Sequence, residues 1–165
     1  MTNRADGISP RSLSNLDHRI MAAACCGALA LLVPVALYQT KVISHLSDPP
    51  FPLFDSDQIT RSEAAHPFGV PDALWGLASF GVTLVLIGAS RHDPRVRKVL
   101  GAKLALDAGA ASLNAARQVV SFGKLCSWCM GSAIATGVMT FAGRELVAEL
   151  FADAHKLLEK EVQGG

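Results

Sequence analysis

Four apolar stretches interrupt an otherwise polar chain, and each is about as long as a membrane-spanning helix. They cover residues 20–38, 73–90, 99–121 and 126–143. A hydrocarbon core ~30 Å thick requires roughly 20 apolar residues in helical form. The first stretch is longer than the apolar part of a signal peptide and no small-residue cleavage site follows it, so we expect it to be retained. The pattern predicts an all-α fold, namely an integral membrane four-helix bundle.

The third stretch carries polar residues that a simple hydropathy average rejects. At 100° per residue these residues fall within one stripe that is about 100° wide, and apolar residues occupy the rest of the helix surface. Such a helix faces lipid with its apolar sides and turns the polar stripe into the bundle. The stripe consists of Lys103, Asp107, Asn114, Arg117, Gln118 and Ser121.

The charges in the connecting segments predict an orientation. Arg and Lys gather in residues 1–19, 91–98 and 144–165, whereas residues 39–72 carry more acidic than basic side chains. Short segments rich in Arg and Lys stay in the cytoplasm. We therefore expect a multi-pass protein of the plasma (inner) membrane, with both termini cytoplasmic and residues 39–72 on the outer side.

The two terminal segments differ in pattern. Residues 1–19 are polar and are expected to be disordered. Residues 144–165 repeat apolar side chains at helical spacing and are charged on the other side, so they predict a cytoplasmic amphipathic helix that lies on the membrane interface or on a sister subunit. Its apolar positions are Leu146, Val147, Leu150, Phe151, Ala154, Leu157 and Leu158.

Composition supports the class of membrane proteins and gives no support for the class of nucleic-acid-binding proteins. Half of the 165 residues are hydrophobic and only 18% are charged, which is too apolar for an ordinary soluble domain of this size. The formal net charge is +1, and no basic run is interleaved with aromatic residues. These observations give no support for nucleic-acid binding.

The candidate chemistry is a pair of cysteines at the outer start of the fourth stretch. Cys126 and Cys129 are three residues apart, so their side chains can meet on one face of a helix start. The unpaired N–H groups of that first turn favour a thiolate at Cys126. Such a pair can form an exchangeable disulfide, which passes between proteins or hands two electrons to an organic acceptor.

Two other roles for the pair remain open from the residues alone. The cysteines could form a static bridge, or they could be half of a zinc site with His45 and His66 on the same outer side. Neither histidine has the spacing of a metal ligand, and no metal site is expected. Cys25 and Cys26 lie deep in the first stretch, far from Cys126, and are expected to be small-residue filler.

At this point the chain resembles the vitamin K epoxide reductase family of four-helix membrane proteins. The likeness covers roughly residues 16–143. It rests on "PFGVPDALWG" (67–76) before the second helix, "LCSWC" (125–129) at the fourth, and the order of the spans. The resemblance implies a quinone, of the menaquinone or ubiquinone type, held in the bundle beside the cysteines. It implies that Cys129 faces the quinone and that Cys126 exchanges disulfides with a thioredoxin-like protein in trans.

The chain departs from the family in the outer connection. Family members usually carry two more cysteines there, which relay electrons from a protein substrate, and this chain has none in residues 43–72. Ser62 falls near a hydroxyl position of the family. Either the partner attacks the Cys126–Cys129 disulfide directly, or the chain is a degenerate member, a non-enzymatic membrane subunit whose cysteines are structural.

A quinone site requires an apolar pocket with a few polar groups near the thiols. Phe68, Trp75 and Trp128 are candidates to pack against the ring. Asn114, with its neighbours in the polar stripe, is a candidate to bind a carbonyl oxygen. Lys103 and Asp107, four residues apart, are expected to neutralise each other, with a proton route as the alternative.

Overall fold

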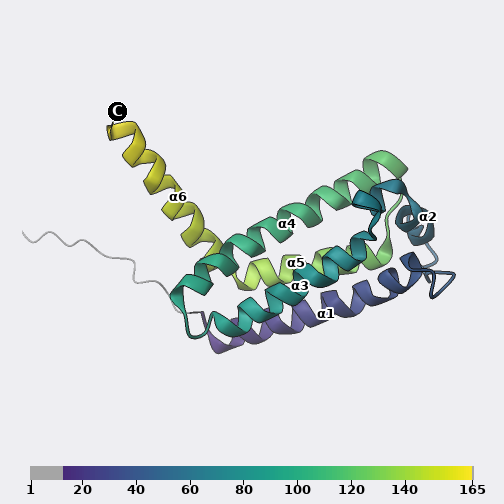
Figure 1. Ribbon diagram of the computed structural model, residues 1–165, viewed down its shortest axis with the longest axis horizontal. Helices are drawn as coiled ribbons and strands as arrows, with labels where there is room; N and C mark the ends of the chain where they lie inside the picture. Colours follow the sequence, from purple (N-terminus) through teal and green to yellow (C-terminus); the bar gives the residue numbers. More distant parts are fainter. Residues whose placement is uncertain (1–12, 165) are drawn as a thin grey trace, which may run out of the picture.

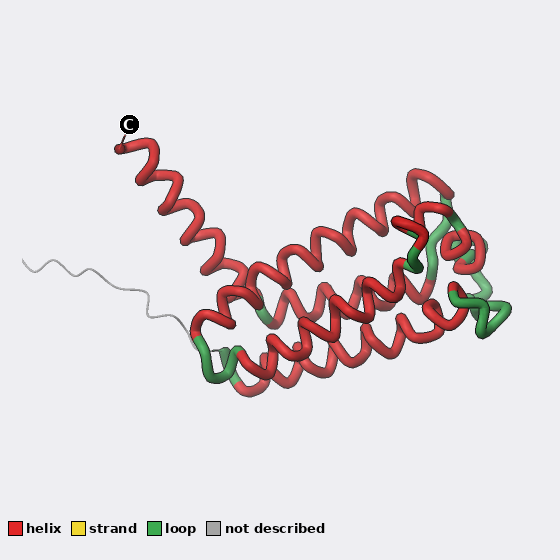
Figure 2. Tube along the Cα trace, viewed as in Figure 1, coloured by secondary structure: helices red, strands yellow, loops and turns green. Residues whose placement is uncertain are grey.

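The protein is a bundle of four long helices, described here for residues 13–164 of a computed structural model (Figure 1). The prediction of an all-α fold is confirmed, because the described residues form helices and loops without a strand (Figure 2). Four helices run side by side. They are α1 (Asn15–Gln39), α3 (Asp72–Ala89), α4 (Pro94–Phe122) and α5 (Ser127–Ala142).

Local signals set the helix ends, and they lengthen two of the predicted elements. α1 begins at Asn15 because Ser14 and Asp17 form a capping box, so residues 15–19 are helical. The rest of the segment expected to be disordered lies almost entirely outside the described residues. α4 begins at Pro94 behind the capping Asp93 and ends at Gly123, whose φ of 61° is left-handed.

The connection between α1 and α3 folds into short helices at one end of the bundle, called the α2 end below (Figure 1). Gln39, the last residue of α1, fixes this connection. Its Nε2 donates to Asp72 Oδ1 at 2.8 Å and to Thr60 O at 3.3 Å, and its Oε1 accepts from Ala73 N at 3.2 Å. The short helices are α2 (Ser56–Arg61), η1 (Glu63–Ala65) and η2 (Pro67–Gly69).

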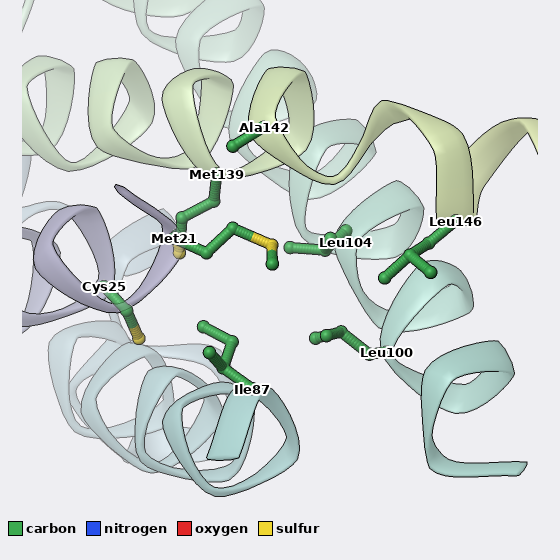
Figure 3. Close-up of a cluster of buried hydrophobic side chains, with 8 residues drawn as sticks. All are labelled: Met21, Cys25, Ile87, Leu100, Leu104, Met139, Ala142 and Leu146. Atoms are coloured by element: carbon green, nitrogen blue, oxygen red, sulfur yellow. The ribbon is translucent and has the colours of Figure 1, made fainter. Parts of the chain in front are cut away.

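The main apolar core lies at the opposite end of the bundle (Figure 3). Cys25 is buried in this core, and its thiol donates to Phe80 O at 3.2 Å, whereas Cys26 is exposed. The helices therefore pack tightly at this end. The core side chains are Met21, Cys25, Ile87, Leu100, Leu104, Met139, Ala142 and Leu146.

α6 (Arg144–Gly164) leaves the bundle at this core end and projects away from it (Figure 1). Its first turns pack on α4, where Leu146 is buried and Lys98 Nζ lies 2.7 Å from Asp153 Oδ2. The tail is helical, as its sequence pattern predicts.

Two of the described helices, α1 and α3, are long and apolar enough to cross a membrane. α4 is more polar, and α5 has 16 residues. Large apolar side chains are nevertheless exposed on the outside of all four helices. Examples are Val33 and Leu37 on α1, Val82 and Val85 on α3, Leu106, Leu113 and Val120 on α4, and Ile134, Val138 and Phe141 on α5.

We expect Gly101→Ala to destabilise the junction of α4 and α6. A Cβ at residue 101 would lie 2.6 Å from the carbonyl oxygen of Leu146, so backbone would have to move. Overpacking of this kind costs about 1–3 kcal/mol. Thermal unfolding of the purified protein measures the effect. Gly109→Ala, also in α4, meets nothing within 4 Å and should be neutral or stabilising; equal effects would contradict the packing account.

Candidate functional site

Cys126 caps the N-terminus of α5 at the α2 end of the bundle. Its backbone is extended, and its Sγ accepts a hydrogen bond from Cys129 N at 3.2 Å. The N–H groups of a first helical turn have no partner within the helix, so a capping group has to satisfy them. Here the cap is sulfur, and a donated N–H stabilises its thiolate form. The expected pairing of the motif with a helix start is therefore present in the structure.

Two other N–H groups of this helix start are bound by side chains from elsewhere in the chain. Cys126 N donates to Gln118 Oε1 at 2.9 Å, and Ser127 N donates to Ser56 Oγ at 3.1 Å. Gln118 belongs to the polar stripe of α4, and Ser56 begins α2. The cysteine motif is thus held between α4 and the connection that follows α1.

Asp48, Ser56 and Ser127, called the Asp48 cluster below, join that connection to the motif. Asp48 Oδ1 accepts from the hydroxyls of Ser56 and Ser127, each at 2.6 Å, and Asp48 Oδ2 accepts from Ser56 N at 2.6 Å. Burial opposes ionisation of Asp48, but the hydrogen bonds from Ser127 and Ser56 outweigh it and hold the pKa of the carboxyl below its ordinary value.

A short parallel bridge reinforces the same contact. Leu125 N donates to Leu53 O at 2.9 Å, and Asp55 N donates to Leu125 O at 3.0 Å. The residues on both sides of Cys126 are therefore bound to segment 48–56, and the Cys126 side chain is 0% exposed. A reagent from water reaches its sulfur only if this segment moves.

Cys129 faces a different environment, a half-open cavity of about 320 Å³ between the helices. All four long helices line it, with Val35 from α1, Gly76 from α3, Asn114 from α4 and Ala133 from α5 among the wall residues. Apolar residues make up the larger part of the wall, and its polar members include the charged residues Asp72, Asp107 and Arg117. The two thiols of the motif therefore lie in two different environments. Cys126 is buried under the connection between α1 and α3, and Cys129 lies in the wall of the cavity.

The structure separates the predicted quinone-site residues into two groups. Asn114 lines the cavity with Cys129, and Ser62 lines a small adjoining pocket that also contains Asn114 and Cys129. The aromatic candidates are not in the cavity wall. Phe68 is 97% exposed, Trp75 is 56% exposed, and Trp128 Nε1 donates to Ser47 O at 3.0 Å.

The sequence did not reveal Asp48, Ser56 and Ser127 as site residues. Asp48 and Ser56 lie in an irregular connection, where no periodicity shows which side chain faces the bundle. Ser127 lies inside the motif, but a serine there carries no signal of its own. Gln118 was visible only as one member of the polar stripe.

The zinc alternative is not supported by the positions of its histidines. His45 Nδ1 lies 2.7 Å from Asp57 Oδ2, and His66 Nδ1 lies 3.1 Å from Ser62 O. Burial raises the pKa of Asp57, but hydrogen bonds from His45 and Leu46 N outweigh it and hold this pKa below its ordinary value. The described residues contain no group of three or more His, Cys, Asp or Glu that could hold a metal.

The fold and the site together define a helical protein with a thiol pair between a capped helix start and an internal cavity. A model of the vitamin K epoxide reductase family matches residues 19–142, which is most of the chain. The chain therefore belongs to this family, as its motifs indicate. No curated protein and no solved structure gave a match. Membership supports oxidoreductase chemistry at a membrane, and the family in general uses a quinone and thioredoxin-like partners.

We expect Asp48→Ala to expose the thiol of Cys126. The change removes the acceptor of three hydrogen bonds, and bonds to a charged group are each worth ~1.5–3 kcal/mol. Local opening should become at least about tenfold more frequent. Mass spectrometry after a short pulse of iodoacetamide measures alkylation at Cys126.

The neighbouring Ser47→Ala is the matched control, because Trp128 binds only the backbone carbonyl of Ser47. Its alkylation rate should equal that of the unchanged protein. Equal alkylation of Asp48→Ala and Ser47→Ala would show that the cluster does not cover Cys126.

The Asp48 cluster also depends on pH. Because the pKa of Asp48 is lowered in the fold, the cluster is at full strength above the ordinary carboxyl pKa range and weakens as the pH falls through the lowered pKa.

Proposed function

We propose that this protein is a four-span membrane thiol-disulfide oxidoreductase. In this proposal it oxidises a thioredoxin-like partner in trans through Cys126 and Cys129 and transfers the electrons to a quinone. The observation that carries the proposal is the location of Cys129 in the wall of a cavity that all four long helices line. Family membership supplies the general chemistry.

Exposed apolar side chains support a membrane position for the whole bundle. α1 and α3 qualify as spans by length and composition, and α4 and α5 run beside them. Large apolar residues outside a bundle are unfavourable in water, whereas lipid accommodates them. The core end of the bundle, where α6 begins, carries Arg91 in the loop before α4 and Arg95 and Arg97 in the first turn of α4. In this proposal that end is therefore cytoplasmic, and the cysteine motif faces outward.

The thiol half of the reaction follows from the cap of α5. A thiolate of the partner attacks the sulfur of Cys126 in the Cys126–Cys129 disulfide, and Cys129 leaves as a thiolate. A second thiolate of the partner then attacks the mixed disulfide and releases Cys126. Cys129 N–H stabilises the released sulfur of Cys126, because it already donates to that atom.

The cavity fits a quinone ring. A site for such a molecule is concave, mostly apolar and supplied with a few oriented polar groups. The described cavity meets these requirements, and Asn114 offers an amide donor in the same wall as Cys129. When bound there, a quinone supplies an acceptor for two electrons. Asn114 would bind a carbonyl oxygen, and Cys129 would present its sulfur to the ring.

The absence of cysteines between α1 and α3 gives the Asp48 cluster a role in this proposal. Cys126 is fully buried, so a partner reaches it only after segment 48–56 moves away. A static, structural cysteine pair is the alternative that this burial favours, and the two are separated by the next experiment.

Replacing each cysteine tests the proposed function. Cys126→Ser and Cys129→Ser should each reduce quinone reduction driven by a dithiol to background, because both sulfurs are needed for the disulfide. Cys129→Ser alone should accumulate a mixed disulfide at Cys126, since the resolving thiol is gone. Absorbance of the quinone and non-reducing mass spectrometry measure the two results.

The control is Cys26→Ser, because Cys26 is exposed on α1; this variant should behave as the unchanged protein. Full quinone reduction by Cys126→Ser would contradict the proposal.

Filling the cavity tests where the quinone binds. Ala133 lines the cavity beside Cys129, whereas Ile134, the next residue of α5, is exposed on the outside of the bundle. Ala133→Phe should raise the dissociation constant for quinone at least about tenfold, because the ring occupies the same volume. Fluorescence titration with quinone measures it. Ile134→Phe should bind normally; equal affinities for both variants would place the quinone elsewhere.

A further inference from the structure

A polar cluster lies inside the bundle, between α3 and α4. Lys103 Nζ lies 2.5 Å from Asp107 Oδ1 and donates to Ser79 Oγ at 2.8 Å. Thr83 Oγ1 donates to Asp107 Oδ2 at 3.1 Å. The side chains of Lys103 and Asp107 are only 20% and 14% exposed. Charges are costly within a membrane helix and are usually retained for function.

This cluster borders the cavity that contains Cys129. Ser79 and Asp107 both belong to the cavity wall, together with Asn114. Asp107 and Asn114 are on the same helix, separated by about two turns, which is roughly 10 Å at 1.5 Å per residue. The cavity thus has two polar ends: one carries Asn114, Arg117 and Asp72, and the other carries Ser79 and Asp107.

We propose that Lys103 and Ser79 deliver a proton to the end of the cavity away from Asn114. Lys103 donates its proton to Ser79 Oγ, and the Ser79 hydroxyl passes its own hydrogen into the cavity. The hydroxyl hydrogen can turn because its present bond to Asp107 Oδ1 is long, at 3.3 Å. This inference rests on the proposed function, because it supplies a proton to the same cavity.

The proton balance of the reaction gives such a donor a role. Oxidising the Cys126 and Cys129 thiols forms one S–S bond and releases two electrons and two protons, and reducing a quinone to a quinol consumes two of each. When a partner dithiol reduces the pair, segment 48–56 has moved, so one partner proton is lost to outer water and Cys126 remains a thiolate. The other partner proton passes to Cys129 as its thiolate leaves. The Cys129 proton and the Lys103 proton therefore satisfy the two quinol oxygens. Lys103 then regains a proton from water at the end of the bundle where α4 begins.

The surroundings of Lys103 suit a proton donor. Both oxygens of Asp107, on the same helix, bind Lys103 Nζ and hold it beside the Ser79 hydroxyl. α1 contributes the Cys25 thiol, which donates to Phe80 O. α3 contributes the hydroxyls of Ser79 and Thr83, and α5 contributes Thr136 at the cavity wall.

Ser79→Ala tests the relay. Prereduced protein is mixed with excess quinone, and a single turnover is followed by quinone absorbance. General acid catalysis contributes ~10²–10⁴ in rate, so we expect Ser79→Ala to be at least about tenfold slower. Ser79→Thr keeps the hydroxyl and should keep most of the rate. The matched control is Ser112→Ala on α4, whose hydroxyl donates to Ala108 O on the exposed side of the helix.

Two further measurements distinguish a relay from a binding contact. The dissociation constant for quinone, from fluorescence titration, should change less than threefold in Ser79→Ala. In oriented liposomes, a pH-sensitive dye should report one proton per turnover taken up at the face where α4 begins, and Ser79→Ala should abolish this uptake. The double variant Lys103→Met/Asp107→Leu, which leaves no unpaired charge, should abolish it too.

Each outcome has a distinct meaning. A normal single-turnover rate in Ser79→Ala, weaker binding that accounts for the whole loss, or proton uptake only at the outer face would overturn the relay. All three leave the proposed function intact, provided that quinone reduction still depends on Cys126. Quinone reduction that persists in Cys126→Ser would instead overturn the proposed function.

Discussion

The hydrogen bonding of the first turn of α5 is the constraint on which the site depends. A helix start that is buried beneath other segments has to find partners for its N–H groups. Here the partners are the sulfur of Cys126, the amide of Gln118 and the hydroxyl of Ser56. Each comes from a different part of the chain, so the cap also positions α4 and α2. The atom proposed to react is thus one of the groups that hold the helix start in place.

The Cys126 sulfur is thus both a cap of α5 and the atom proposed to react, so its oxidation state affects the cap. A thiolate accepts an N–H bond more strongly than a disulfide sulfur, because its charge is localised on the accepting atom. Forming the Cys126–Cys129 bond would therefore weaken the cap of α5 at the hydrogen bond from Cys129 N.

The sequence reveals the parts of the site that obey a period or a motif. The CxxC spacing identifies Cys126 and Cys129, and 100° periodicity identifies the stripe of α4. The structure places much of that stripe at the site: Asp107, Asn114 and Arg117 line the half-open cavity, and buried Gln118 binds Cys126 N. Family membership follows from the same motifs.

The remaining site residues depend on long-range contacts that no local pattern encodes. Asp48 and Ser56 meet Ser127 only because the connection folds back over the end of the bundle. The aromatic candidates are predicted from their closeness in sequence to the motifs. The direction in which Trp75 points depends instead on the rotation of α3, which places Gly76 and Ser79 at the cavity and Trp75 outside it.

The division of the motif between two environments explains how a chain without further cysteines in its connection can still serve two partners. Cys126 is bounded by hydrogen-bonded loop residues, which water and a protein can displace, whereas Cys129 borders an apolar cavity among the helices. Electrons that enter at one sulfur and leave from the other cross this boundary within a single turn of helix. The proposed relay adds a proton donor at the opposite end of the cavity, where Lys103 and Ser79 lie. Electrons and one of the two protons then reach the cavity from different ends.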